Sequence, residues 1–341
     1  MDKYTITNID TISWQSELKN SFLNPKDFLE YLNLNPKEFI KDIEAKNLFS
    51  FRVTKHFASL MKKQDPKDPL FMQVITSKNE FIEQAGFNSD PLEEKGSNPL
   101  PGLLHKYTNR VLLIFKTSCA TNCRYCFRRD FPYSSNGLSK EKLLDILDYI
   151  KSKSELDEVI LSGGDPLSST DEHLKWFINK LETINHIKLL RIHTRFPIMI
   201  PSRITDKLCK TFKNSRLTIS LVFHINHQNE IDQRFTNCAK KLKDANVILL
   251  NQNVLLKNIN DNPITLKNLN MKLVSIGIIP YYLFLFDKVK GATHFYVDNK
   301  KAKEIYLELQ KISSGFTLPK LSRELPNQEY KTLIPINTYQ D

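Results

Sequence analysis

Apolar, β-branched runs recur at a near-constant spacing along the chain from residue 110 onward. Amphipathic patterns with a helical period lie between and after them. Because strands that alternate with helices pair in parallel through right-handed crossovers, this pattern predicts an α/β fold. Six such units fit an incomplete (β/α)6 barrel, in which functional residues lie at the carboxyl ends of the strands. The predicted strands are 110–117, 156–162, 187–194, 216–223, 247–256 and 278–287, and the predicted helices include 140–151, 171–184, 230–243 and 298–312.

The first 100 residues have a different pattern, in which helical segments are punctuated by proline. The pairs Asn24-Pro25 and Asn35-Pro36 predict helix starts, because Asn caps a helix and Pro fits its first position. A polar stretch with Pro and Gly at 90–102 predicts a boundary. We therefore divide the chain into a helical N-terminal region (1–100), the partial barrel (101–313) and a C-terminal segment (314–341).

Three cysteines, Cys119, Cys123 and Cys126, lie in one short loop directly after the first predicted strand. Iron–sulfur clusters are bound by cysteine thiolates, normally four of them. A cluster held by three thiolates keeps one iron open to a small molecule, as catalytic metal sites keep an open position. Cys123 and Cys126 alone would also fit a thioredoxin-like redox pair or half of a zinc site. A zinc site requires a second pair of ligands, and Cys209 and Cys238 are not spaced to provide one.

Polar and glycine residues follow several of the other predicted strands. Gly163, Gly164 and Asp165 come after the second, His224 ends the fourth, and Gln252 lies in the fifth. Two glycines allow a close approach of the backbone to a ligand, although such a pair is often only a tight turn. A single His or Gln at this edge can be a satisfied polar residue, but several that converge on one mouth indicate a binding site.

Composition and charge limit the other classes of function. The 341 residues carry a formal net charge of +11, but Lys and Arg are scattered and no nucleic-acid motif accompanies them. This favours a solvated basic surface, with attraction of an acidic partner as the alternative. No apolar run could span a bilayer, and the N-terminus lacks a secretory signal. Together with clustered rather than paired cysteines, these features predict a cytoplasmic protein with no membrane partner.

The spacing C-x3-C-x2-C, with Tyr125 before the last cysteine, resembles the signature of the radical S-adenosylmethionine (SAM) enzymes. The resemblance implies a radical SAM barrel and a [4Fe–4S] cluster on Cys119, Cys123 and Cys126, whose open iron binds SAM. It also implies that the Gly-Gly-acid motif contacts the methionine part of SAM. The SAM residues expected on this basis are Gly163, Gly164, Asp165, His224 and Gln252.

Several longer sequence motifs resemble those of one family of radical SAM enzymes, the lysine 2,3-aminomutases. They run from about Phe51 to Lys331 and include Leu100-Pro-Gly-Leu-Leu-His-Lys-Tyr107, Ser162-Gly-Gly-Asp-Pro-Leu, Arg191-Ile-His-Thr-Arg and His224-Ile-Asn-His-Gln-Asn-Glu-Ile231. The compact length is similar to the branch that makes (R)-β-lysine for modification of bacterial elongation factor P. The resemblance implies an isomerase that converts L-α-lysine to (R)-β-lysine with a 5′-deoxyadenosyl radical and pyridoxal phosphate (PLP). The implied partners are L-lysine, an electron donor of the flavodoxin or ferredoxin type, and a β-lysine ligase for elongation factor P.

The resemblance also implies residues for PLP and for the substrate. Register from Leu318-Pro319 makes Lys331 the lysine that forms the Schiff base with PLP, although its segment lacks the glycines typical of the family and Lys320 is a nearby rival. Asp287 and Glu324 occupy the positions that bind the ε-ammonium of lysine, and both are acidic, which favours a cationic substrate. The implied PLP phosphate ligands are Lys106, Arg110 and Arg195, and the implied carboxylate ligand is Arg128.

Two alternatives stay open at this point. One is a radical SAM aminomutase that acts on another basic amino acid. The other, from a different class, is a zinc-binding protein that binds nucleic acid, and only the net charge favours it.

Overall fold

The computed structural model describes residues 13–133, 136–326 and 328–336. They form one nine-stranded sheet in which the strands follow each other in chain order, from β1 to β9. The strands β2 to β8 are parallel, whereas β1 and β9 pair antiparallel at the two edges. The strands are β1 (Leu103–Tyr107), β2 (Arg110–Lys116), β3 (Glu158–Gly163), β4 (Leu189–Thr194), β5 (Thr218–Phe223), β6 (Ile248–Val254), β7 (Ile279–Phe284), β8 (Lys320–Arg323) and β9 (Thr332–Leu333).

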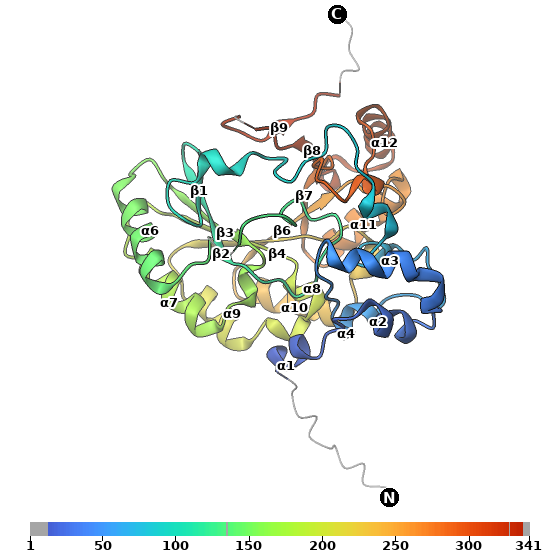
Figure 1. Cartoon of the computed structure of the whole chain (residues 1–341). Helices are drawn as coiled ribbons and strands as arrows, with labels where there is room; N and C mark the ends of the chain where they lie inside the picture. Colours follow the sequence, from blue (N-terminus) through green and yellow to red (C-terminus); the bar gives the residue numbers. More distant parts are fainter. Residues whose placement is uncertain (1–12, 134–135, 327, 337–341) are drawn as a thin grey trace, which may run out of the picture.

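The sheet curves into an incomplete barrel with helices on its outer side (Figure 1). Among the described residues, β1 and β9 do not pair with each other, so the barrel stays open between them. The covering helices are α6 (Lys140–Ser152), α7 (Asp171–Leu181), α8 (Phe196–Met199), α9 (Asp206–Lys213), α10 (Gln233–Asp244), α11 (Pro263–Ser275) and α12 (Asn299–Ile312). None of the helices in the described ranges is both long and apolar enough to cross a bilayer.

Local sequence explains where the longer helices begin. Each of them follows a Ser, Thr, Asp or Asn whose side-chain oxygen accepts a hydrogen bond from a backbone N–H of the first turn. Such a cap satisfies an N–H group that has no partner within the helix. The capping residues are Ser139, Thr170, Thr205, Asp232, Asn262 and Asp298.

All six predicted parallel strands are confirmed, with bounds shifted by a few residues. The prediction missed a seventh parallel strand, β8, which pairs with β7. It has only four residues, too few for a periodic pattern. The predicted division at residue 313 therefore falls between α12 and β8, and the sheet continues into the C-terminal segment.

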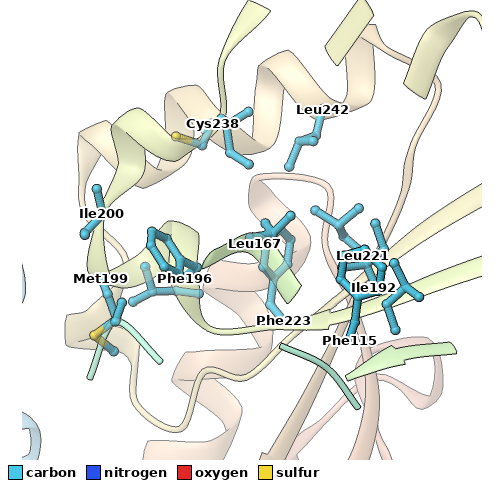
Figure 2. Packing of buried hydrophobic residues seen from close by; sticks show 14 of the residues in the cluster. Phe115, Leu167, Ile192, Phe196, Met199, Ile200, Leu221, Phe223, Cys238 and Leu242 are labelled. Atoms are coloured by element: carbon cyan, nitrogen blue, oxygen red, sulfur yellow. The ribbon is translucent and has the colours of Figure 1, made fainter. Parts of the chain in front are cut away.

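The main core lies between the sheet and its covering helices. Aromatic and aliphatic side chains on the helix-facing side of the sheet, from β2, β4 and β5, pack with residues of α8 and α10 (Figure 2). Phe115 of β2 and Phe223 of β5 are almost completely buried there. Close packing of this kind holds the strand ends, and the loops that follow them, in fixed positions.

The N-terminal region is helical, as predicted, and Asn24 and Asn35 cap the segments that start at Pro25 and Pro36. Its helices lie beside the barrel near α8 and α10 (Figure 1). They are α1 (Trp14–Lys19), α2 (Pro25–Tyr31), α3 (Ile40–Glu44), α4 (Lys55–Ser59) and α5 (Pro69–Met72).

A buried ion-pair group joins this region to the cysteine loop. The Arg124 guanidinium is fully buried and donates to Glu80 Oε1 at 2.9 Å and to Glu80 Oε2 at 2.6 Å. It also donates to the carbonyl oxygens of Phe49 and Ser50, at 3.0 and 2.9 Å. Arg129 donates to the same Glu80 carboxylate at 2.7 Å. Glu80 therefore neutralises two arginines of the loop that follows β2.

Replacement of Glu80 by Ala is expected to lower the free energy of unfolding by about 3–5 kcal/mol, because two buried guanidinium groups lose their shared partner. Urea denaturation followed by circular dichroism measures this loss. The control is Glu308→Ala, which removes an exposed pair with Lys311 and is expected to cost less than about 1 kcal/mol. Equal losses in the two variants contradict the role of Glu80.

Candidate active site

Three thiols line one cavity at the carboxyl ends of the strands, in the loop after β2. They belong to Cys119, Cys123 and Cys126, as the sequence predicts. The loop backbone is held from the N-terminal region, since Arg52 donates to the Cys119 carbonyl oxygen at 3.0 Å and Asn122 N–H donates to the Arg52 carbonyl oxygen at 3.0 Å. Burial raises the pKa of the Cys126 thiol to about 11, so iron must displace protons when it binds.

The other two cysteines lie outside this cavity. Cys209 belongs to α9, and Cys238 of α10 donates to the Pro201 carbonyl oxygen at 3.0 Å. The donor set is thus three thiols without a fourth, which fits a cluster with one open iron. In the described part of the chain, no three His, Cys, Asp or Glu side chains are arranged to hold a single metal ion.

The Gly-Gly-Asp loop after β3 packs directly on the start of the cysteine loop. Gly163 has φ +111°, and a Cβ there would lie 2.4 Å from the Lys116 carbonyl oxygen. A Cβ on Gly164 would lie 2.6 Å from the Ser118 carbonyl oxygen. Both glycines are therefore required by backbone packing. Gly164 and Asp165 also line the cavity with the cysteines.

The Asp165 carboxylate ties this loop to the end of β4. Its Oδ2 accepts from the backbone N–H of Arg195 at 2.8 Å and of Phe196 at 2.9 Å, and its Oδ1 accepts from Leu167 N–H at 3.0 Å. Thr194 Oγ1 donates to both oxygens. Burial raises the pKa of Asp165 to about 6, against these hydrogen bonds, which favour the ionised form.

His224 and Gln252 reach the same cavity, as predicted. His224 Nε2 lies 2.9 Å from the hydroxyl oxygen of Tyr125, the residue before Cys126. Burial, with the nearby Arg195 charge, lowers the pKa of His224 to about 3, so its imidazole is neutral. His224 therefore presents hydrogen-bonding groups and no charge to a ligand.

The structure does not bring Arg195 to Lys106 and Arg110, so the three predicted phosphate ligands do not form one group. Arg195 lies beside the cysteines, and its Nη1 is 2.8 Å from Cys123 Sγ. Its Nη2 donates to Glu230 Oε2 at 2.9 Å. The resemblance to the family is what implied a phosphate contact for Arg195. Both of its terminal nitrogens already have partners here.

A second cavity contains the other predicted PLP residues, Lys106, Arg110 and Lys331. Lys331 Nζ lies 2.7 Å from Glu324 Oε2, and Lys106 Nζ lies 3.5 Å from Glu324 Oε1. Lys320 is exposed at the start of β8 and does not line this cavity. The geometry therefore favours Lys331 over its rival.

Sequence reasoning missed three residues that this region brings together. Tyr107 donates to Glu324 Oε1 at 2.7 Å, and the Arg110 guanidinium lies 4.0 Å from the centre of the Tyr107 ring. His193 borders both cavities. Glu94, at the start of η4 (Glu94–Ser97), lines the second cavity. Tyr107 and His193 lie within the sequence motifs on which the family resemblance is based, so these motifs could have identified them. No motif in the sequence indicates a role for Glu94.

The two predicted acidic residues differ in charge state. Burial alone would raise the pKa of Glu324, but the ion pair with Lys331 and the hydrogen bonds from Lys331 and Tyr107 lower it to about 2. Burial, together with the nearby Glu324 charge, raises the pKa of Asp287 to about 7, against the attraction of Lys331. Asp287 thus titrates near neutral pH, whereas Glu324 remains ionised.

Arg128, the predicted carboxylate ligand, is paired with Glu94. Arg128 Nε donates to Glu94 Oε2 at 2.8 Å, and Nη2 donates to Glu94 Oε1 at 2.5 Å. This two-pronged grip on a carboxylate is the geometry that a substrate carboxylate would take. Glu94 thus occupies the position in which Arg128 would bind another carboxylate.

Comparison with known proteins agrees with this geometry. A sequence profile of the Radical SAM superfamily matches residues 113–265. The L-lysine 2,3-aminomutase of Haemophilus influenzae is 50% identical over 321 residues, which cover 94% of this chain and 95% of that protein. The L-lysine 2,3-aminomutase of Escherichia coli is 47% identical over 328 residues, 96% of each chain. The L-lysine 2,3-aminomutase of Clostridium subterminale is 34% identical over 97% of this chain and 80% of that protein. The chain belongs to the L-lysine 2,3-aminomutase family of radical SAM enzymes.

Proposed function

We propose that this chain converts L-lysine to (R)-β-lysine. As a member of its family it is a radical SAM isomerase with a [4Fe–4S] cluster, SAM and PLP as cofactors. The observation that carries the substrate assignment is the presence of two half-buried carboxylates, Asp287 in the first cavity and Glu324, paired with Lys331, in the second. Burial and the Glu324 charge raise the pKa of Asp287, and a cationic substrate such as lysine, with its ε-ammonium, would compensate the acid that Lys331 does not pair with.

The residues of the two cavities fit these cofactors. The three cysteines would hold the cluster, and Gly164, Asp165, His224 and Gln252 lie where SAM would reach them. Lys331 would hold PLP, with its phosphate at Lys106 and Arg110. When bound, the cluster and SAM supply a 5′-deoxyadenosyl radical, and PLP supplies a conjugated ring that spreads unpaired spin. The first cavity borders the second at His193, so the two chemistries meet there.

The chain's own residues orient the substrate. Arg128 grips its carboxylate in place of Glu94, and Asp287 and Glu324 hold the ammonium at the other end. Two charged ends at fixed positions select the length of the amino acid between them, which disfavours shorter or longer basic amino acids.

The biological setting is part of the proposal. The alignments cover almost the whole length of the H. influenzae and E. coli relatives. This similar length supports a place in the compact branch of the family, which the sequence analysis linked to elongation factor P. We expect the (R)-β-lysine to be used by a ligase that modifies elongation factor P in the cytoplasm. We also expect an electron donor of the flavodoxin or ferredoxin type to reduce the cluster.

An anaerobic assay of the reconstituted chain with SAM, PLP, a reductant and a panel of amino acids tests the function. We expect β-lysine from L-lysine, with ornithine, arginine and glutamate turned over far more slowly. Chiral chromatography identifies the product. Preferred turnover of another basic amino acid contradicts the lysine assignment and leaves the reaction type intact.

Replacement of Lys331 by Ala is expected to abolish covalent PLP binding, because no other lysine of the second cavity stands at the position that the family uses. Borohydride reduction followed by peptide mapping locates the cofactor on the wild-type chain. Lys320→Ala is the matched control and should bind PLP normally. A label on Lys320 refutes the assignment.

The pKa of Asp287 leads us to expect that kcat/KM for L-lysine depends on pH. Because its carboxyl has a pKa of about 7 and binds ammonium only when ionised, kcat/KM for L-lysine should fall about tenfold per pH unit below pH 7. The variant Asp287→Asn should not show this fall of kcat/KM below pH 7, the acid limb of the pH profile. It should also lower kcat/KM at pH 8 by ~30-fold or more, the equivalent of about 2 kcal/mol for a lost buried charge partner.

The control for this experiment is Asp244→Asn, at an exposed carboxylate paired with Lys240. It should keep the full pH profile of the wild type. If the limb below pH 7 persists in Asp287→Asn, another group is responsible for it.

A further inference from the structure

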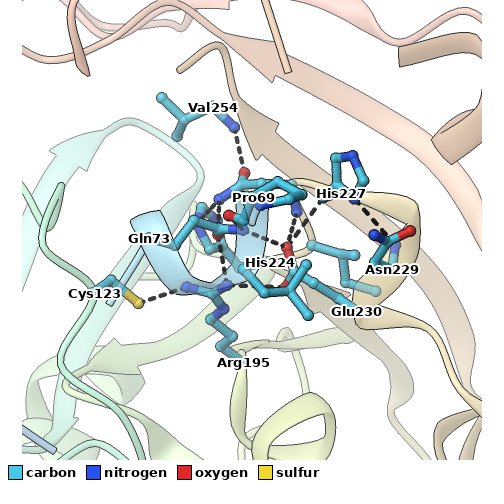
Figure 3. A network of polar contacts seen from close by, with 12 residues as sticks. Pro69, Gln73, Cys123, Arg195, His224, His227, Asn229, Glu230 and Val254 are labelled. Carbon is cyan, nitrogen blue, oxygen red and sulfur yellow. Dashed lines mark hydrogen bonds and ion pairs between the residues drawn. The ribbon is translucent and has the colours of Figure 1, made fainter. Parts of the chain in front are cut away.

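Arg195 lies between a predicted cluster ligand and a buried carboxylate. One terminal nitrogen, Nη1, donates to Cys123 Sγ at 2.8 Å and to the Tyr125 hydroxyl at 2.5 Å. The other, Nη2, donates to Gln73 Oε1 at 2.7 Å and to Glu230 Oε2 at 2.9 Å. Figure 3 shows the guanidinium with the thiol on one side and the carboxylate on the other.

The position of Arg195 is fixed from both ends of its side chain. Its backbone N–H donates to Asp165 Oδ2 at 2.8 Å, and only 8% of the residue is exposed. The Phe57 and Tyr125 rings lie 5.4 and 5.7 Å from the guanidinium. Both terminal nitrogens are therefore used by protein partners, whereas the buried Nε has no hydrogen-bond partner among the described residues. The contact between Nη1 and the Cys123 sulfur places positive charge beside a predicted cluster ligand.

Glu230 is held in place independently of Arg195. It is fully buried, and its Oε1 accepts from the backbone N–H groups of Asn226 at 2.9 Å and His227 at 3.0 Å, and from Gln73 Nε2 at 3.1 Å. The ion pair therefore has a fixed orientation. The Arg195 guanidinium contacts Cys123, and the Glu230 carboxylate lies on the opposite side of the guanidinium. Such a pair is electrically neutral as a whole, yet places positive charge beside the thiolate.

We propose that Arg195 is a positioning residue that raises the reduction potential of the iron–sulfur cluster through its hydrogen bond to Cys123, with Glu230 limiting the effect. Hydrogen bonds to cluster sulfurs and local charge set these potentials, and partners of the ligands tune metals in general. One-electron reduction adds negative charge, which a buried guanidinium stabilises. The inference rests on the proposed role of Cys123 as a cluster ligand.

The test is a redox titration of the full chain, reconstituted anaerobically without SAM and followed by electron paramagnetic resonance. For Arg195→Met we expect at least a tenfold fall in the ratio of reduced to oxidised cluster at a fixed potential. That corresponds to a shift of the midpoint by about 59 mV to more negative values for a one-electron couple. The midpoint potential of Arg195→Lys should lie between those of Arg195→Met and the wild type. Lysine keeps the positive charge but lacks the planar guanidinium that donates to several partners at once.

Glu230→Gln gives a prediction of opposite sign. It keeps an oxygen that can accept from Asn226 and His227 and removes the negative charge, so the midpoint should move to more positive values. This variant also keeps the proposal testable if Arg195→Met does not fold. The control is Arg203→Met, which removes a fully buried arginine paired with Asp171 that makes no contact with a cysteine among the described residues. It should leave the midpoint unchanged.

Each outcome has a distinct meaning. A midpoint that is unchanged in Arg195→Met and in Glu230→Gln, at wild-type iron content, overturns the inference and leaves the proposed function standing. A shift that occurs only after SAM is added also overturns it, and assigns Arg195 to the SAM carboxylate instead. A wild-type chain that takes up no iron overturns the proposed function itself. Shifts of opposite sign in the two variants support the inference.

Discussion

The pairing of buried charges is the constraint on which the mouth of this barrel depends. A cation removed from water is costly unless a carboxylate and further hydrogen bonds compensate it. Around the cysteine loop this requirement is met by pairs that join distant segments, such as Arg124 with Glu80 and Arg195 with Glu230. The loops after the strands are therefore positioned by electrostatics as well as by the apolar core beneath them.

These pairs fall into two groups that suit different tasks. Glu80 and Glu230 are fully buried, and each carboxylate accepts several hydrogen bonds, so they belong to the permanent scaffold. Lys331 with Glu324 and Arg128 with Glu94 line cavities, where a ligand can reach them. In the second group a protein carboxylate stands where a substrate or cofactor group is expected. The same physical requirement thus produces both the permanent pairs of the scaffold and the pairs that line the cavities.

Much of the fold follows from local pattern. Runs such as the one that became β2 are apolar because both faces of a central parallel strand are buried, and N-terminal caps such as Asn24 and Asn35 mark helix starts. The strand β8 was not predicted, because a four-residue strand has no measurable period. The cysteine loop was predicted directly after a strand, and because all three thiols come from one short loop they line one cavity there.

The sequence by itself determined the alternation of strands and helices, the position of the cysteine loop at a strand end, and the family. Those features depend on neighbours within a few residues, or on strings long enough to be specific. Only the tertiary structure decided which charges meet. Arg195 and Cys123 are 72 residues apart, and Arg124 and Glu80 are 44 apart, so their pairing depends on how whole elements pack. A side chain's partner is set by the three-dimensional path of the chain, and for that reason no local pattern indicated that Arg195 lies beside Cys123, whereas Lys106 and Arg110 line another cavity.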